Sequence, residues 1–352
     1  MIKTASINTS EFSRNELELI FYNKPFDFSY SSMNKLITAP GVFYKEYILK
    51  QREDMDAKHL TRGKMIHYLL LDNGLFDEKY ILAPDGIPSD NTKLIIEHIA
   101  EYARAFPPAG ENKLSSYSDI ILDQLKEINL HQKLVDDKKE PFKTGDEKRL
   151  EKIINPQSDA YFSFLLTKGN REIIDPEVLD KCTVAVDLIR NNKEISELLG
   201  LNIDPSDANF GVYNEVYLRI DTLYAFGLKG FLDNLVVDVK NKTVRINDLK
   251  TTSKSLTQFE GSVEFWNYWL QAGIYFKLAM DFLKDVIKDD WKVEFRFIVV
   301  DQYNHVYPFR VSDTTMRMWI VQTEEELVKA DFHYTNKNYS LPYEFIAGEV
   351  VL

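Results

Sequence analysis

The chain of 352 residues contains a single cysteine, Cys182. One thiol cannot close a disulfide within the chain, and it excludes zinc sites and iron–sulfur clusters that take several cysteine ligands from one polypeptide. A metal ion bound here would therefore have to be held by oxygen and nitrogen ligands.

The sequence also lacks a long hydrophobic run. No uninterrupted apolar stretch approaches the roughly 18 residues that a membrane-spanning helix needs. The first residues do not have the basic start, apolar centre and small-residue cleavage site of a secretory signal. We therefore expect a cytoplasmic protein with no membrane partner.

Positive charge is scarce as well, since 43 Lys and Arg face 55 Asp and Glu and leave a net charge of −12. Non-specific binding to nucleic acids depends mainly on the neutralisation of phosphates by Lys and Arg. The charge balance thus argues against a protein that coats DNA with its whole surface. A DNA enzyme with a localised basic groove or bound divalent cations is still allowed.

What the sequence does contain is enough apolar residues, 44% of the chain, to bury a sizeable core. Alternating β-rich patterns begin near residue 210, whereas residues 84–202 are strongly polar with scattered helical periodicity. We predict an α/β (α+β) fold, with a central mixed, largely antiparallel sheet flanked by helices and a helical insertion. The predicted parts are an N-terminal helical part of the core (1–84), the insertion (85–205), and the core sheet with C-terminal helices (206–352).

Several elements can be placed along the chain. A serine of the run Ser29-Tyr30-Ser31-Ser32 and either Ser312 or Asp313 are expected to be helix N-caps. Apolar periodicity predicts helices over residues 61–71 and 262–282. The run VEFRFIVVD predicts a strand after the second of these helices.

The most informative segment runs from Gly230 to Lys250. Two β-rich runs, 229–239 and 243–249, flank a polar turn, so an antiparallel hairpin should bring Asp233 and Asp248 together. Lys250 should project to the same side as Asp248, because strand side chains alternate. Two such acids could hold Mg²⁺ or Mn²⁺, with the carbonyl of Leu249 as a further ligand and Lys250 orienting the attacking water.

A surface hairpin with charges on its polar face would show the same spacing. The leucines beside both acids argue for burial, however, and a buried carboxylate is costly unless it is paired or bound to a metal.

Four other residues have two readings each. His67, four residues after Gly63, is either an ordinary satisfied helix histidine or an imidazole ligand suited to Mn²⁺. Glu215 either forms a surface ion pair with Lys or Arg or belongs to the metal site. Gln271 and Tyr275 share one helix face, where they could contact phosphates or bases together or have a structural role.

In their order along the chain, these residues resemble a known family. Gly63-x-x-x-His67, Glu215, GFLD ending at Asp233, DLKTT starting at Asp248, and Gln271-x-x-x-Tyr275 are similar to the PD-(D/E)XK nucleases of the RecB and exodeoxyribonuclease VIII type. The resemblance covers roughly residues 29–84 and 210–310. The GFLD segment lacks the proline of the family motif, and the insertion has no recognised counterpart.

The resemblance implies a restriction-endonuclease-like core with two bound Mg²⁺ or Mn²⁺ ions. It implies metal ligation by His67, Asp233 and Asp248, assistance to water by Lys250, and Glu215 as a further acid of the site. Substrate contacts are implied for four residues, namely Gln271, Tyr275, Thr251 and Thr252.

The function implied by the resemblance is metal-dependent hydrolysis of DNA. We expect an exonuclease that degrades linear double-stranded DNA in recombination or repair, in a bacterial or phage-infected cell. A single-strand annealing or other recombination protein and further copies of the chain are the partners to test. The alternatives are a catalytically silent DNA- or protein-binding module of the same fold, a structure-specific endonuclease, and a hydrolase of non-nucleic phosphates.

Overall fold

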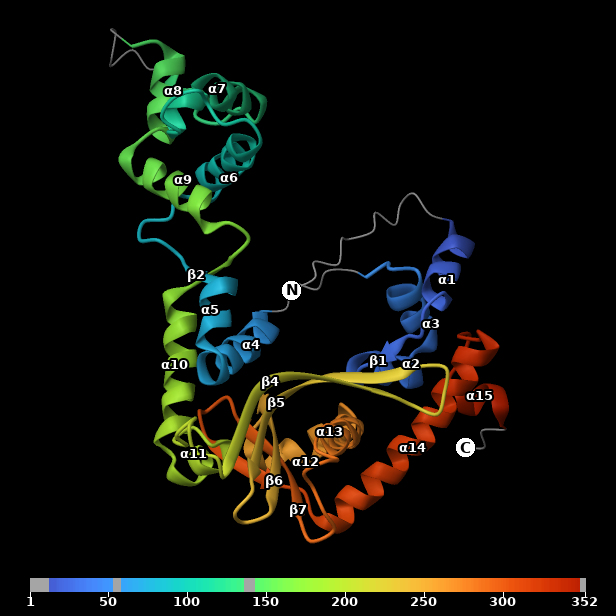
Figure 1. Cartoon of the computed structure of the whole chain (residues 1–352). Coiled ribbons are helices and arrows are strands. Elements are labelled where there is room, and N and C mark those ends of the chain that lie inside the picture. Colours follow the sequence, from blue (N-terminus) through green and yellow to red (C-terminus); the bar gives the residue numbers. More distant parts are fainter. Residues whose placement is uncertain (1–12, 53–57, 136–142, 349–352) are drawn as a thin grey trace. The chain divides into compact units, whose positions relative to one another are not determined.

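The computed structural model describes residues 13–52, 58–135 and 143–348. The chain divides into two compact units (Figure 1). The first consists of Met1–Asn73 together with Cys182–Leu352, and the second is Gly74–Lys181. All the predicted site residues belong to the first unit.

The first unit is built on a mixed sheet in the order β1-β5-β6-β7-β8, with β4 also paired to β5. Three pairs are antiparallel (β4 with β5, β5 with β6, β7 with β8) and two are parallel (β1 with β5, β6 with β7). The predicted mixed, largely antiparallel sheet is confirmed. Its strands are β1 (Asp27–Phe28), β4 (Phe210–Asp221), β5 (Gly227–Asp238), β6 (Thr243–Thr251), β7 (Lys292–Val300) and β8 (Val306–Arg310).

The predicted hairpin is formed by β5 and β6. In its turn, the Asp238 carboxylate accepts hydrogen bonds from the backbone and side-chain amides of Asn241, and Lys242 has a left-handed backbone with φ 51°. Because β6 and β7 are parallel, the chain must cross over between them, and two helices supply this connection. They are α12 (Phe259–Phe265) and α13 (Tyr268–Phe282).

Helices flank the sheet of the first unit as predicted. Helix α13 packs against β4, β5 and β6, and α14 (Asp313–Asn336) packs against α13 (Figure 1). Gly273 of α13 permits this approach, since a Cβ there would lie 2.0 Å from Thr323 Oγ1 of α14. Helices α4 (Lys58–Leu71) and α11 (Lys193–Leu199) contact β5 and β6.

The other helical segments described in this unit are α1 (Arg14–Tyr22), α2 (Tyr30–Thr38), α3 (Pro40–Phe43), a π-helical turn (Tyr44–Ile48), most of α10 (Pro176–Asn191), a 3-10 turn (Leu256–Gln258) and α15 (Tyr343–Ala347). Both predicted caps are confirmed. The capping serine of residues 29–32 is Ser29, which accepts a hydrogen bond from Ser32 N, and of the two later candidates it is Ser312 that caps, accepting from Thr315 N. Among the described residues, no helix combines the length and apolar composition needed to cross a membrane.

The predicted single helix over residues 262–282 is wrong. It is two helices, α12 and α13, separated at Trp266 and Asn267. Asn267 has a left-handed backbone with φ 55°, which asparagine tolerates better than most residues. The Trp266 carbonyl accepts hydrogen bonds from the Tyr30 hydroxyl and Asn34 Nδ2. Contacts with α2, which are distant in sequence, thus accompany the break.

The second unit is mainly helical. Its described elements include α5 (Asn73–Lys79), β2 (Tyr80–Leu82), α6 (Asp90–Ala105), α7 (Ser118–Glu127), α8 (Gly145–Ile153), α9 (Pro156–Lys168), β3 (Glu172–Ile174) and the start of α10. Strands β2 and β3 pair in parallel, and α6 packs against α9. The unit begins and ends earlier than the predicted insertion 85–205. Helix α11, within that predicted range, contacts the core sheet instead, where its Leu199 carbonyl accepts from Asn234 Nδ2.

Candidate metal centre

An irregularity in strands β4 and β5 positions two of the acids. The ladder pairs Asn214 with Asn234 and Val216 with Leu232 but omits Glu215 and Asp233 between them. Glu215 has φ 47°, in the left-handed region, which is uncommon for a residue other than glycine. Leu232 and Leu235 lie in the same hydrophobic cluster although they are three residues apart, so the two-residue alternation is interrupted at Asp233. Such local irregularities re-aim side chains.

Within the described part of the chain, His67, Glu215 and Asp233 form a cluster that could hold a metal ion. Their ligand atoms all lie within 4.8 Å of one another. His67 Nδ1 is 3.3 Å from Glu215 Oε1 and 3.7 Å from Asp233 Oδ2. Arg219, four residues after Glu215 in β4, pairs with Asp27 and Asp221. The structure therefore brings one helix and two strands together at a nitrogen-and-oxygen donor set.

The hydrogen bonds of His67 determine which of its ring nitrogens could bind such an ion. Nε2 is 2.9 Å from the Leu249 carbonyl, which can only accept, so this nitrogen carries a proton. Burial alone would lower the pKa of His67, but the Asp233 and Glu215 carboxylates outweigh it and raise that pKa to about 9. In the metal-free protein Nδ1 is thus also protonated. A cation that replaces this proton would meet Nδ1 and two carboxylates, which fits Mg²⁺ or Mn²⁺.

Asp248 and Lys250 lie beside this cluster. The Lys250 ammonium contacts Asp248 Oδ2, as the alternation of side chains along β6 predicted, and Gln271 Nε2 donates to Asp248 Oδ1 at 2.8 Å. Asp248 is fully buried, and this burial raises its pKa to about 6 against the opposing effect of Lys250. Burial also raises the pKa of Asp233. Each carboxylate thus lies in an environment where its charge needs a cation.

Asp233 also accepts a hydrogen bond from the Leu249 N–H at 2.7 Å. The backbone ladder between β5 and β6 ends at Asn234 and Asn247. Beyond it, the Asp233 side chain replaces a backbone carbonyl as the acceptor for the Leu249 N–H. The Leu249 carbonyl, predicted as a metal ligand, bonds to His67 Nε2 in this structure. Leu249 thus links His67 to Asp233 through its own peptide groups.

Gln271 and Tyr275 share a helix face, as predicted, but both are buried, with 6% and 9% of the residue surface exposed. Gln271 holds Asp248, and burial raises the pKa of Tyr275 well above its ordinary value. Tyr275 packs over Gly230, where an added Cβ would lie 2.9 Å from the ring. In this structure the two side chains support the site, and their predicted contact with substrate stays a prediction.

Thr251 and Thr252 follow Lys250 at the end of β6. A Cβ added at Gly63 would lie 3.1 Å from Thr251 Oγ1, so this glycine brings α4 close to the strand that carries Asp248. The Thr252 hydroxyl accepts the N–H of Lys254 at 3.0 Å. Both threonines shape the strand end beside the cluster, and their predicted contacts with substrate stay predictions.

Two tyrosines that the sequence analysis did not single out also adjoin the site. Lys250 Nζ lies 4.7 Å from the centre of the Tyr268 ring, a cation–π arrangement. The pKa of Tyr30 is raised by burial and, to a smaller extent, by the charges of Tyr268 and Asp248. Tyr268 precedes Gln271 by three residues, and this helical spacing is the signal that could have identified it.

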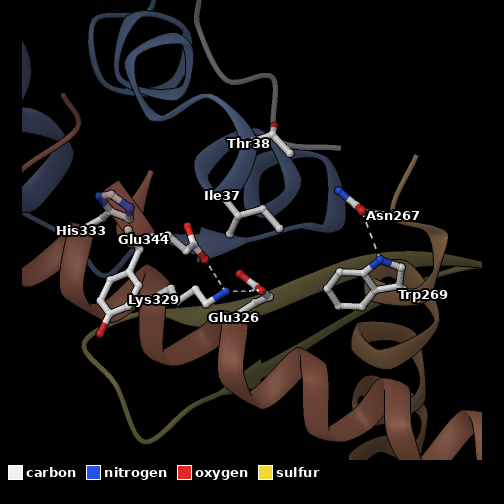
Figure 2. Close-up of a pocket in the computed structure, with 9 residues that line it drawn as sticks. Ile37, Thr38, Asn267, Trp269, Glu326, Lys329, His333 and Glu344 are labelled. Atoms are coloured by element: carbon white, nitrogen blue, oxygen red, sulfur yellow. Dashed lines mark hydrogen bonds and ion pairs between the residues drawn. The ribbon is translucent and has the colours of Figure 1, made fainter. Parts of the chain in front are cut away.

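A separate pocket of about 210 Å³ lies elsewhere in the first unit, and none of the predicted site residues lines it (Figure 2). Lys329 there forms ion pairs with Glu326 at 2.8 Å and Glu344 at 2.6 Å. The lining residues are Ile37, Thr38, Asn267, Trp269, Glu326, Lys329, His333, Tyr343 and Glu344. Its two glutamates already share an ammonium, which distinguishes it from the donor set around His67.

Comparisons with known proteins add little to this geometry. No family model matches the sequence, and no curated protein matches it. Among solved structures, the chain is similar to a crystal structure named "Putative exonuclease" from Eubacterium rectale. The identity is 13%, the match covers 96% of this chain and 88% of that chain, and the TM-score is 0.44. Similarity at this level does not bear on activity, so the function must be argued from the residues of the site.

Proposed function

We propose that this chain is a Mg²⁺- or Mn²⁺-dependent deoxyribonuclease of the PD-(D/E)XK type. The observation that carries the proposal is the set of His67, Glu215 and Asp233 ligand atoms within 4.8 Å, next to a buried Asp248 paired with Lys250. The order of elements, in which α4 precedes the strands β4, β5 and β6 and α13 precedes β7, is consistent with a restriction-endonuclease-like core.

Each side chain has a defined task in this proposal. His67 Nδ1, Glu215 and Asp233 would hold a cation, and Asp248 would hold a second or share the first. Bound ions lower the pKa of water and neutralise charge that develops on a phosphodiester. Lys250 would orient the attacking water and stabilise negative charge on the phosphate. Gln271 keeps one oxygen of Asp248 in place.

Metal binding tests the first half of the proposal. Titration calorimetry with Mn²⁺ and with Mg²⁺ should show binding to the full chain, and Asp233→Asn should weaken it. Asp238→Asn is a matched control, because Asp238 is a buried acid of the same strand that bonds to the turn residue Asn241. Equal metal binding by the native chain, Asp233→Asn and Asp238→Asn would show that Asp233 is not a metal ligand.

DNA hydrolysis tests the second half. The finer proposal is an exonuclease that acts on linear duplex DNA in recombination or repair, in a cytoplasmic setting. End-labelled linear DNA and closed circular DNA should be incubated with Mg²⁺, Mn²⁺ or chelator. Release of nucleotides from linear DNA alone supports an exonuclease, whereas cutting of circles identifies an endonuclease. Metal binding without any DNA hydrolysis would favour the silent binding module or the hydrolase of other phosphates.

Partners can be tested with the same material. Light scattering of the full chain would show whether copies associate, and a pull-down with a single-strand annealing protein would test the recombination setting. If the chain is monomeric and hydrolyses DNA without a partner protein, the nuclease proposal stands and the proposed oligomer is wrong.

A further inference from the structure

Two exposed aromatic side chains lie where the chain turns between α12 and α13. Phe265 is 70% exposed and Trp266 51% exposed, and their rings meet edge to face with centroids 4.7 Å apart. Exposed apolar residues that occur singly are ordinary. A paired set of large rings beside a candidate catalytic centre is not, because contiguous exposed apolar surface commonly marks a binding site.

The turn that presents these rings is held by several hydrogen bonds. The Trp266 carbonyl accepts from the Tyr30 hydroxyl and from Asn34 Nδ2. Asn267 Nδ2 donates to Asn34 Oδ1 at 2.8 Å, and Trp269 Nε1 donates to Asn267 Oδ1 at 3.1 Å. The backbone beneath the rings is therefore fixed to α2 and α13, which lowers the entropy that the rings would lose on binding a ligand.

The same turn is connected to the candidate metal centre on both sides. Tyr268, two residues after Trp266, lies beneath the Lys250 ammonium, and Gln271 one helical turn further bonds to Asp248. Lys254, four residues after Lys250, lies with Nζ 5.8 Å from the centre of the Phe265 ring and is exposed. The Phe265 ring thus lies near the Lys254 ammonium, and both rings precede α13, the helix that carries Tyr268 and Gln271.

The charges around the turn indicate which part of a nucleic acid it could hold. Glu260 and Glu264, both exposed, lie on α12 just before the rings and would repel phosphates. Lys254 offers one place for a phosphate near Phe265. The rings of Phe265 and Trp266 suit uncharged, planar groups, and every nucleobase presents such a face.

We propose that Phe265 and Trp266 form a stacking surface for unpaired bases of the DNA strand that enters the candidate metal centre, with Lys254 binding an adjacent phosphate. This inference rests on the proposed nuclease function and adds a substrate preference to it. Linear DNA with a short single-stranded tail should bind more tightly than blunt duplex of the same length.

The test compares fluorescence polarisation of the full chain with tailed and blunt DNA, in Ca²⁺ to limit cleavage. The double variant Phe265→Ala/Trp266→Ala should lose the preference for the tail. Stacking on aromatic side chains accounts for roughly 5- to 150-fold in affinity per base, which sets the size of the loss. A fluorescent adenine analogue in the tail should be quenched by the native chain and not by this variant.

Controls separate stacking from damage to the fold. Trp266→Tyr keeps a ring and should retain most of the quenching. Phe345→Ala removes another exposed ring, 58% exposed on α15, and should keep the preference. Equal binding of tailed and blunt DNA by the native chain would overturn the inference and leave the nuclease proposal standing. A native chain that neither binds nor hydrolyses DNA would overturn both.

Discussion

The β5–β6 hairpin carries two adjacent pairs of polar residues, Asn234 with Asn247 and Asp233 with Asp248. The asparagines bond to each other and to neighbouring acceptors through their amide nitrogens. Asn247 Nδ2 donates to Asn234 Oδ1 at 2.7 Å and to the Leu198 carbonyl at 3.0 Å. Asn234 Nδ2 donates to the Leu199 carbonyl and to Asn214 Oδ1. An amide both donates and accepts, so a chain of amides can link Asn214, Asn234 and Asn247 to one another and to the carbonyls at the end of α11.

The aspartates next to them cannot do this, because ionised carboxylates only accept hydrogen bonds. Their donors come from elsewhere: Leu249 N for Asp233, and Gln271 with Lys250 for Asp248. Burial nevertheless raises the pKa of Asp248 to about 6. Two neighbouring polar pairs of one hairpin thus differ in charge and in where their hydrogen-bond donors come from. The acidic pair places negative charge in a buried site, where the Lys250 ammonium meets Asp248, and the amide pair places none.

The largest expected effect comes from making the acidic pair resemble the amide pair. Asp248→Asn preserves shape but removes a buried negative charge, so DNA hydrolysis should fall about a thousandfold, a loss comparable to that of one electrostatic group in an active site. The melting temperature of the protein without added metal should fall as well, because the Lys250 ammonium loses the carboxylate with which it is paired. Initial rates and thermal unfolding measure the two effects. Activity within tenfold of the native chain would exclude Asp248 from the site.

The reverse change tests the amide pair. Asn247→Asp would place a carboxylate beside Asn234 Oδ1 and the Leu198 carbonyl, with no donor left for either. A buried charge without a partner costs about 3–5 kcal/mol, so the free energy of unfolding at neutral pH should fall by that amount in urea titrations. Asn192→Asp is the control, since either residue can cap α11 through the bond to Ile195 N. Equal stability of Asn247→Asp and Asn192→Asp would show that the amide pair tolerates a buried charge.

Much of the fold follows from local sequence patterns. The β5–β6 hairpin, the caps at Ser29 and Ser312, and the shared side of Asp248 and Lys250 each depend on a few neighbouring residues. Periodicity and capping chemistry act over the same short range, which is why they could be predicted.

The features that escaped prediction depend on contacts distant in sequence. The break at Asn267 lies in an apolar run, and its hydrogen bonds come from α2, more than 200 residues earlier. The left-handed backbone of Glu215 leaves no pattern in its neighbours, yet it accompanies the pairing of this acid with His67 rather than Arg219. The inward position of Gln271 likewise follows from the strand beneath it, so its bond to Asp248 could not be inferred from helical spacing alone.

A smaller effect should appear as a pH dependence of the metal-free protein. The pKa of His67 is raised from 6.5 to about 9 in the folded chain, so folding binds its proton more tightly. Its contribution to stability is complete below pH 6.5 and is lost as pH rises to about 9, by at most about 3 kcal/mol. Unfolding free energies across this range should fall for the native chain and stay flatter for His67→Gln.

Added Mn²⁺ should act in the opposite direction over the same range. A metal ion and a proton compete for His67 Nδ1, so stabilisation by Mn²⁺ should increase with pH as the proton becomes easier to displace. Stabilisation by Mn²⁺ that does not change between pH 6.5 and 9 would place the ion away from His67.

The smallest effect is expected at the outer end of the amide chain. Asn214 is exposed, and its Oδ1 accepts from Asn234 Nδ2 at 2.7 Å. Asn214→Ala removes that acceptor, but Asn234 keeps its bond to the Leu199 carbonyl and water can reach the vacated side. The free energy of unfolding should therefore fall by only about 1 kcal/mol, as for one ordinary hydrogen bond, in urea titrations. A loss as large as that of Asn247→Asp would mean that the amide chain acts as one unit, and the distinction from the acidic pair would then concern charge alone.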